Sequence, residues 1–107
     1  MTLFEWDEDK AESNLRKHGI PFGHATQVFD DPFILAELER IEDREERWQS
    51  IGLVEGIAVV FVAHTVREEG WDELIRIISA RRATRKEQRR YGQNRQKNSR
   101  RVQTDGR

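Results

Sequence analysis

The sequence contains no cysteine and no long apolar run, and each absence excludes a class of protein. Without cysteine the chain forms neither a disulfide framework nor a thiolate metal site. The longest apolar run, Ile57–Ala63, is far too short to cross a bilayer. The first residues, MTLFEWDEDK, lack the basic and apolar regions of a signal peptide. These absences predict a soluble, cytoplasmic protein without membrane contact.

Motifs that bind catalytic metals are also missing. The chain has no HExxH motif, no cysteine–histidine cluster and no close carboxylate–histidine spacing. Its histidines, His18, His24 and His64, fall in three different predicted elements. We therefore expect no metal ion and no organic cofactor, and we expect His24 and His64 to be structural.

Charge is distributed unevenly along the 107 residues, although the net charge is only −1. From Arg76 to Arg107 there are 12 lysines and arginines against two acids, whereas the rest of the chain holds seven against 18. Two interpretations fit this asymmetry. The C-terminal third contacts a polyanion or an acidic protein surface, or it is a basic helix that is merely solvated.

The N-terminal segment predicts a short edge strand followed by two helices. Leu3–Trp6 form the strand, and Asp7 is a suitable N-cap because acids follow it in the first turn. The first helix ends at His18, with Gly19 in the position that a left-handed residue commonly takes. A second, shorter helix begins at Pro21 and ends at an Asp-Asp-Pro sequence.

A change of periodicity from Phe33 onward predicts a sheet of four strands. The expected strands are Phe33–Leu38, Arg47–Val54, Ile57–Val66 and Glu73–Ile78. The third is apolar on both faces and is expected to be central. The charged run Glu37–Glu46 is expected to include a solvated loop.

A basic helix is expected from about Ala80 to Tyr91. The residues after Gly92 contain no large apolar residue except Val102, and they predict a disordered basic tail. Residues 1–91 would then form the domain and residues 92–107 the tail. The predicted fold class is α+β: two N-terminal helices and a C-terminal helix packed on one face of a four-stranded, mainly antiparallel sheet.

Five stretches of the chain, in this order, match a known family. They are FEWDEDKAESNLRKHGI, ATQVFDDP, EERWQSIG, Arg67 at the end of a strand, and RIISARRATRKEQRRY. The chain resembles the BrnT toxins, the ribonuclease half of a type II toxin–antitoxin pair, with a fold similar to that of RelE toxins. The resemblance covers about the first 91 residues.

The resemblance implies an activity and a set of partners. The activity is RNA cleavage that inhibits translation. The partner is a BrnA-like antitoxin with a DNA-binding domain, in a heterotetramer of two toxins and two antitoxins that represses its own operon. Operator DNA would be contacted only through the antitoxin, because this chain has no recognisable helix-turn-helix or ribbon-helix-helix segment.

RNA cleavage without a metal needs a base for the 2′-hydroxyl proton, a cation for the phosphate charge and a donor to the leaving oxygen. Lys17 and His18 close the first helix, where cations also stabilise the helix dipole without any further function. The resemblance places this pair in the active site, with His18 as general base or general acid.

Arg67 and Arg76 are the expected phosphate-binding cations. An arginine inside an apolar strand, such as Arg76, is costly unless it faces a polar site or an ion-pair partner. If Arg67 pairs with Asp72 across the hairpin, both arginines lie on one face, whereas pairing with Glu73 puts them on opposite faces. The resemblance expects both in the site, where their guanidinium groups would hold a phosphate bidentately.

Further candidates surround the charged run. Trp48 either stacks on an unpaired RNA base or covers the sheet edge, and Arg47 beside it is a candidate RNA-binding residue. Glu46 is either a general base or a solvated loop residue. Arg81 and Arg82 belong to the basic helix, which binds RNA phosphates or docks an acidic antitoxin.

An alternative function of a different class fits the same residues. The chain would then be a non-catalytic nucleic-acid-binding or adaptor module, because a fold by itself does not establish chemistry. The two functions differ in whether Lys17, His18, Arg67 and Arg76 converge on one phosphate.

Overall fold

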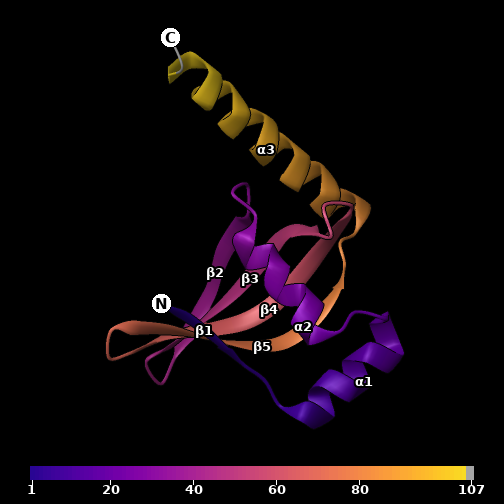
Figure 1. The fold of residues 1–107 in the computed structure, drawn as a ribbon, viewed down its shortest axis with the longest axis vertical. Coiled ribbons are helices and arrows are strands. Elements are labelled where there is room, and N and C mark those ends of the chain that lie inside the picture. The colour runs from indigo at the N-terminus through magenta and orange to yellow at the C-terminus, as the bar shows by residue number, and fades with distance from the viewer. Residues whose placement is uncertain (106–107) are drawn as a thin grey trace.

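The computed structural model describes residues 1–105 and the side chains of residues 1–99. It is an α+β fold in which three α-helices and one 3₁₀ helix surround a five-stranded mixed sheet of order β1-β5-β4-β3-β2 (Figure 1). The elements are β1 (Thr2–Glu5), α1 (Glu8–His18), α2 (Phe22–Ala25), the 3₁₀ helix η1 (Thr26–Asp30), β2 (Leu35–Glu42), β3 (Glu45–Val54), β4 (Ala58–Glu69), β5 (Asp72–Arg82) and α3 (Arg85–Asp105).

The first helix, α1, begins and ends where the sequence predicts. The Asp7 side chain accepts hydrogen bonds from two backbone amides of the first turn, and Gly19 ends the helix at φ 71°. Asn14 on this helix is buried, and its side-chain amide bonds both backbone groups of Ala80 at 2.8 and 3.1 Å. Because β1 pairs with β5 only as far as Arg76, Asn14 satisfies backbone groups of β5 beyond that point and fixes α1 there.

The sheet has five strands, and the predicted number of four is wrong. The additional strand is β1, which pairs in parallel with β5, whereas the other neighbouring strands are antiparallel. A strand of four residues carries little pattern, and its partner lies about 70 residues away in the sequence. The expected edge strand at Leu3–Trp6 is therefore present, shifted by one residue, but as part of this sheet.

The charged run Glu37–Glu46 is also different from the prediction. It forms most of a hairpin between β2 and β3, with a two-residue turn at Asp43 and Arg44, whose φ angles are 48° and 67°. Positive φ angles at both central residues are typical of a type I′ turn, whose twist matches the twist of the two strands. Charged residues fit this hairpin because β2 is an edge strand and its residues from Ala36 onward are exposed.

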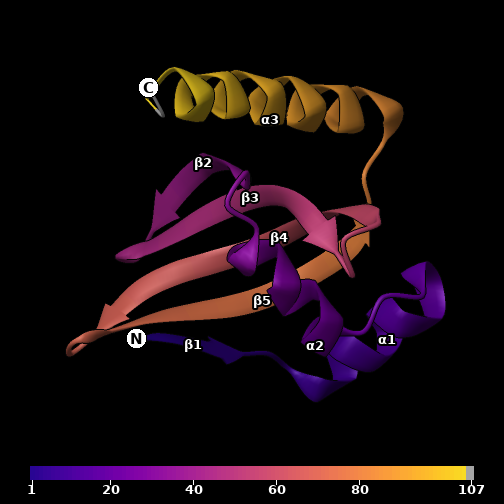
Figure 2. The same cartoon turned by 45° about the horizontal axis from the view of Figure 1, so that its top comes forward.

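The helices cover two faces of the sheet, and the prediction that they share one face is wrong. Residues of α2 and η1 pack on alternate residues of β4, including Val60 and Val62, and we call this side the helix face. Tyr91 of α3 packs on the other side with Ile51 and Phe61. Strand alternation separates the two sets, and Figure 2 shows the sheet between α3 and the N-terminal helices.

The last helix runs from Arg85 to Asp105, so the predicted bounds Ala80–Tyr91 are wrong at both ends, and Arg81 and Arg82, predicted on this helix, lie on β5. Strand β5 continues to Arg82, and Thr84 and Glu87 then form a capping box in which each backbone amide donates to the other side chain. The helix continues through Gly92 to Asp105, over most of the stretch predicted as a disordered tail. Its lysines, arginines and glutamines have good helix propensity.

The division into a domain of residues 1–91 and a tail stays a prediction, and residues 106–107 lie outside the described part. None of the described helices is long and apolar enough to span a membrane.

Candidate active site

Arg67 and Arg76 lie on the same face of the sheet, through a register that differs from both predicted ones. Arg67 pairs with Leu74, and Arg76 pairs with Thr65. Thr65 and Arg67 are two residues apart on β4, so their side chains project to the same side. The hairpin is tighter than either prediction assumed, since Glu69 already pairs with Asp72. The shared face that a common phosphate site requires is present.

A row of arginines crosses the sheet at this level. Arg40 of β2 lies beside Arg47 of β3, which lies beside Thr65 of β4, which lies beside Arg76 of β5. We call this side of the sheet the arginine face; it is the side on which α3 packs further along the strands. Like charges on directly opposite residues of neighbouring strands are destabilising. An anion bound over the row would offset that repulsion.

The two predicted catalytic arginines have carboxylate partners at the surface. Arg76 Nε lies 3.1 Å from Glu5 Oε1, and Arg67 Nε lies 3.2 Å from Glu69 Oε2. All four side chains are more than a third exposed. Exposed pairs of this kind contribute only about 0–1 kcal/mol. An RNA phosphate can therefore replace either carboxylate at small cost.

Arg76 lines a hollow of about 250 Å³ at the start of α1, together with Lys10 and Trp6. Lys17 and His18 are exposed at the other end of α1, about 10 Å farther along the axis than Lys10 at 1.5 Å per residue. The hollow includes neither of them. Their convergence with the arginines on one phosphate stays a prediction. Lys10, which is not among the predicted site residues, lines the same hollow as Arg76.

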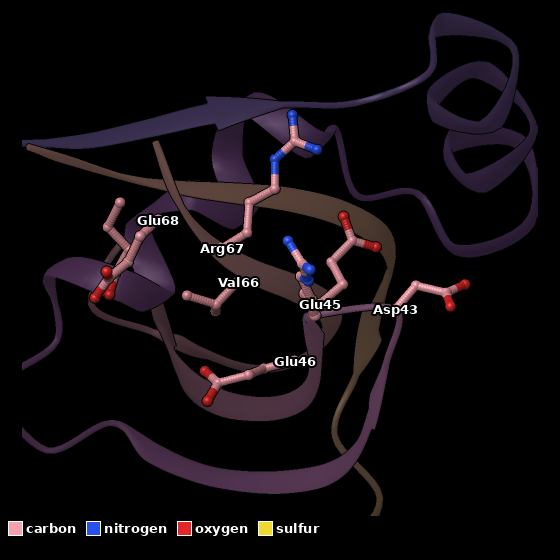
Figure 3. A pocket seen from close by; sticks show the side chains of 8 residues that line it. Asp43, Glu45, Glu46, Val66, Arg67 and Glu68 are labelled. Atoms are coloured by element: carbon pink, nitrogen blue, oxygen red, sulfur yellow. The ribbon is translucent and has the colours of Figure 1, made fainter. Parts of the chain in front are cut away.

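Arg67 lines a second hollow, of about 520 Å³, between the tips of the two hairpins (Figure 3). Glu46 lines it as well, but the Arg67 and Glu46 side chains point away from one another in Figure 3. Trp48 is half-buried on the helix face beside His64, and its Nε1 donates to Glu46 Oε1 at 3.2 Å. Glu46 and Trp48 thus lie on the opposite face from Arg76.

The remaining two candidates also have defined positions. The Arg81 guanidinium donates to both carboxylate oxygens of Glu87 at 2.8 and 3.1 Å, and it lies 4.0 Å from the centroid of the Phe61 ring. The hydrogen bonds from Arg81 lower the pKa of Glu87 to about 2. Arg81 therefore ties α3 to the sheet. Arg82 is exposed and lies beside Val60, which belongs to the helix face. RNA contacts of either arginine stay predictions.

His64 is buried, as expected of a structural histidine. Its Nε2 lies 2.7 Å from Ser50 Oγ, and its ring packs edge-on against Phe29 at 4.7 Å between centroids. Burial lowers the pKa of His64 to about 4, with partial opposition from the Thr65 backbone. His64 and Ser50 are only 3% and 1% exposed, so this pair cannot meet a substrate.

Comparison with known proteins identifies the family. No curated protein matches the chain. A family model described as "Ribonuclease toxin, BrnT, of type II toxin-antitoxin system" matches residues 6–87, which run from the end of β1 to the first turn of α3. The matched range contains Arg47, Arg67 and Arg76, and it confirms the resemblance stated from the sequence. The chain belongs to the BrnT family of ribonuclease toxins of type II toxin–antitoxin systems.

Proposed function

We propose that this chain is an endoribonuclease that cleaves RNA to inhibit translation, and that it works through its own side chains without a metal ion or organic cofactor. The observation that carries the proposal is the arginine row: Arg47, Thr65 and Arg76 adjoin on neighbouring strands, with Arg67 on the same face. Arg67 and Arg76 are exposed, and planar guanidinium groups suit the non-bridging oxygens of a phosphate.

In the proposed reaction the 2′-hydroxyl attacks the adjacent phosphorus, and the bond from phosphorus to the 5′-oxygen breaks. A base removes the 2′-hydroxyl proton, and an acid gives a proton to the departing oxygen. The products are a 2′,3′-cyclic phosphate end and a 5′-hydroxyl end. The arginines stabilise the charge that develops on the phosphate. His18 and Lys17 remain the proposed proton-transfer residues, with Lys10 as a cation nearer to Arg76. Glu46, on the opposite face from Arg76, is not retained as an alternative base.

The basic helix α3 extends the same side of the sheet. Its first turns pack on the arginine face through Tyr91. Among the α3 side chains that the structure describes, up to residue 99, five cations are exposed: Arg85, Lys86, Arg89, Arg95 and Lys97. We propose that the RNA backbone runs from the arginine row toward these residues. For single-stranded RNA, each phosphate contact should add about −0.7 to the slope of the logarithm of the binding constant against the logarithm of the salt concentration.

Regulation is proposed to come from the protein partner that a type II toxin implies. We propose that the partner is a BrnA-like antitoxin and that two toxins and two antitoxins assemble. The antitoxin would supply the DNA-binding domain through which the complex represses its own operon in the cytoplasm. The lack of a recognisable DNA-reading segment in this sequence supports that division of roles.

A second candidate function is a non-catalytic RNA-binding module on the same fold. The observation that favours it is the position of Lys17 and His18, which lie outside the hollow of Arg76. The arginine row would then hold RNA without a proton-transfer pair beside the phosphate.

The proposal is tested by incubating the partner-free protein with a 5′-labelled RNA in EDTA. An Arg67→Ala/Arg76→Ala variant and an Arg16→Ala control, whose arginine is exposed on α1, are compared with the parent. We expect cleavage by the parent and the control but not by the double variant. Binding of RNA without cleavage by any of the three would favour the second candidate. Equal cleavage by the parent and the double variant would contradict the proposed site.

A further inference from the structure

The tips of the two hairpins expose several large apolar side chains that RNA cleavage does not use. Trp71, in the turn between β4 and β5, is 100% exposed. On β2, Leu38 is 46% and Ile41 is 63% exposed. Register places Leu38 beside Trp48, and Ile41 beside Glu46, so both lie on the helix face beyond the part that α2 and η1 cover. Exposed aromatic and aliphatic groups gathered in one region mark interaction sites.

Acidic side chains surround these apolar groups. The 520 Å³ hollow between the hairpin tips is lined by five carboxylates and two arginines; the carboxylates are Asp43, Glu45, Glu46, Glu68 and Glu73. Glu68 and Glu73 also adjoin Trp71 in a neighbouring hollow. Figure 1 shows the two hairpin tips side by side at one end of the sheet. We define the hairpin-tip surface as these five carboxylates with Leu38, Ile41, Trp48 and Trp71.

We propose that the hairpin-tip surface is the docking site for a protein segment that carries both apolar and basic side chains, and that the antitoxin supplies this segment. The proposal rests on the proposed function, because the toxin–antitoxin relation supplies the partner. Charge complementarity identifies the segment's polar groups as lysines and arginines. A fully exposed tryptophan at the tip of a hairpin is the type of residue that anchors a protein interface.

Two other occupants fit this surface less well. RNA is disfavoured between the hairpin tips because five carboxylates there outnumber the two arginines, whereas the arginine face, to which Arg67 also belongs, offers a row of cations. The basic α3 of a second copy supplies charge, but residues 92–99 are Gly, Gln, Asn, Arg, Gln, Lys, Asn and Ser. That stretch has no apolar side chain to cover Ile41 or Trp71. A partner with both kinds of side chain is required.

The position of the hairpin-tip surface also links docking to activity. Arg67 lines the hollow from its arginine-face side. A segment seated between the hairpin tips would therefore lie next to one of the two proposed catalytic arginines. The site suits a partner that must control access of RNA to that arginine.

The test uses the full chain labelled with ¹⁵N and a defined probe, an amphipathic helical peptide of leucine and lysine. The same peptide with glutamate in place of lysine is the control. The indole N–H signals report the location, because Trp71 lies in the turn of one hairpin and Trp48 donates to Glu46 of the other, whereas Trp6 lines the hollow of Arg76. We expect the lysine peptide to shift the Trp48 and Trp71 signals and not that of Trp6, and we expect the glutamate peptide to shift none.

Matched variants distinguish docking at the hairpin-tip surface from nonspecific binding of the peptide. Trp71→Ala should weaken binding of the lysine peptide about tenfold or more. Glu68→Gln/Glu73→Gln should weaken it about fivefold at low salt. Ile57→Ala is the control, because Ile57 is 85% exposed but lies in the turn between β3 and β4, at the opposite end of these strands. It should bind the peptide as the parent does.

Binding that Trp71→Ala leaves unchanged, or peptide shifts confined to Trp6, would overturn the proposal. RNA cleavage by the same preparations distinguishes this failure from failure of the proposed function. Cleavage without docking would reject the docking surface alone. Docking without cleavage would reject the ribonuclease proposal and leave the surface in place.

Discussion

Lowering the pH from 7 to 5 should destabilise the folded chain, because His64 is buried in its neutral form. The residue is 3% exposed, its Nε2 forms a hydrogen bond with Ser50 Oγ, and its Nδ1 has no hydrogen-bond partner among the described residues. Burial lowers the pKa of this imidazole from 6.5 to about 4. The folded protein therefore resists a proton that the unfolded chain accepts.

The size of the effect follows from the two pKa values. The pKa of His64 is lower in the folded protein than in the unfolded chain. The free energy of unfolding is therefore undiminished above pH 6.5, and it decreases as the pH falls toward 4 because the unfolded chain binds the proton more readily. The difference of about 2.5 units corresponds to about 3.4 kcal/mol at 1.36 kcal/mol per unit, reached only below pH 4. At pH 5 about 2 kcal/mol of it should already be lost.

Urea unfolding at pH 7 and pH 5 measures this loss, with a His64→Gln variant as the reference. Glutamine offers an amide to Ser50 but does not titrate, so titration of all other groups is shared by both proteins. The parent should lose about 2 kcal/mol more of its free energy of unfolding than the variant between the two pH values. Equal losses in the two proteins would show that His64 is not the source of the pH dependence.

Two further substitutions test the packing that positions the arginine face. Gly52→Ala should lower the free energy of unfolding by about 1–3 kcal/mol, since a Cβ there would lie 3.0 Å from Val28 Cγ1 and 3.0 Å from Val28 O. The control is Gly23→Ala, where an added Cβ has nothing within 4 Å. Equal losses in the two variants would contradict the close approach of Val28 to Gly52. Tyr91→Phe should cost about 1–3 kcal/mol in the same urea assay, because its hydroxyl donates to Asp31 Oδ2 at 2.5 Å; an unchanged midpoint would show that this bond does not hold α3.

Local features of the fold were predictable from the sequence because their signals are local. The cap at Asp7 and the left-handed Gly19 bound α1 through interactions within a few residues. The apolar run Ile57–Ala63 predicted a central strand, and β4, which begins one residue later at Ala58, is central with both faces packed against other elements.

The rest depended on contacts between distant residues. Parallel pairing of β1 with β5 joins segments about 70 residues apart, and no local pattern encodes it. The outer part of the hairpin of β2 and β3, between the predicted strands Phe33–Leu38 and Arg47–Val54, was missed because its charges are typical of a loop, although edge strands tolerate them. The length of α3 was missed because a polar helix lacks the apolar stripe that marks a packed one.

The candidate site was also predictable from the sequence only in part. The shared face of Arg67 and Arg76 was one of two predicted outcomes, since strand alternation leaves only two choices. Arg40 joins the row only because β2 is a strand there, and that strand was expected to be a loop. The separation of Lys17 from the hollow of Arg76 depends on the direction of α1 relative to β5, which no residue spacing reports.

The most direct test of the central claim, that the arginine row acts on the scissile phosphate, is single-turnover RNA cleavage by Arg76→Ala. Arg16→Ala, which removes an exposed arginine of α1 paired only with Glu12 among the described residues, is measured beside it. We expect Arg76→Ala to lower the cleavage rate at saturating protein by about 100-fold or more and Arg16→Ala to stay near the parent rate. Equal rates for the two variants would contradict the claim.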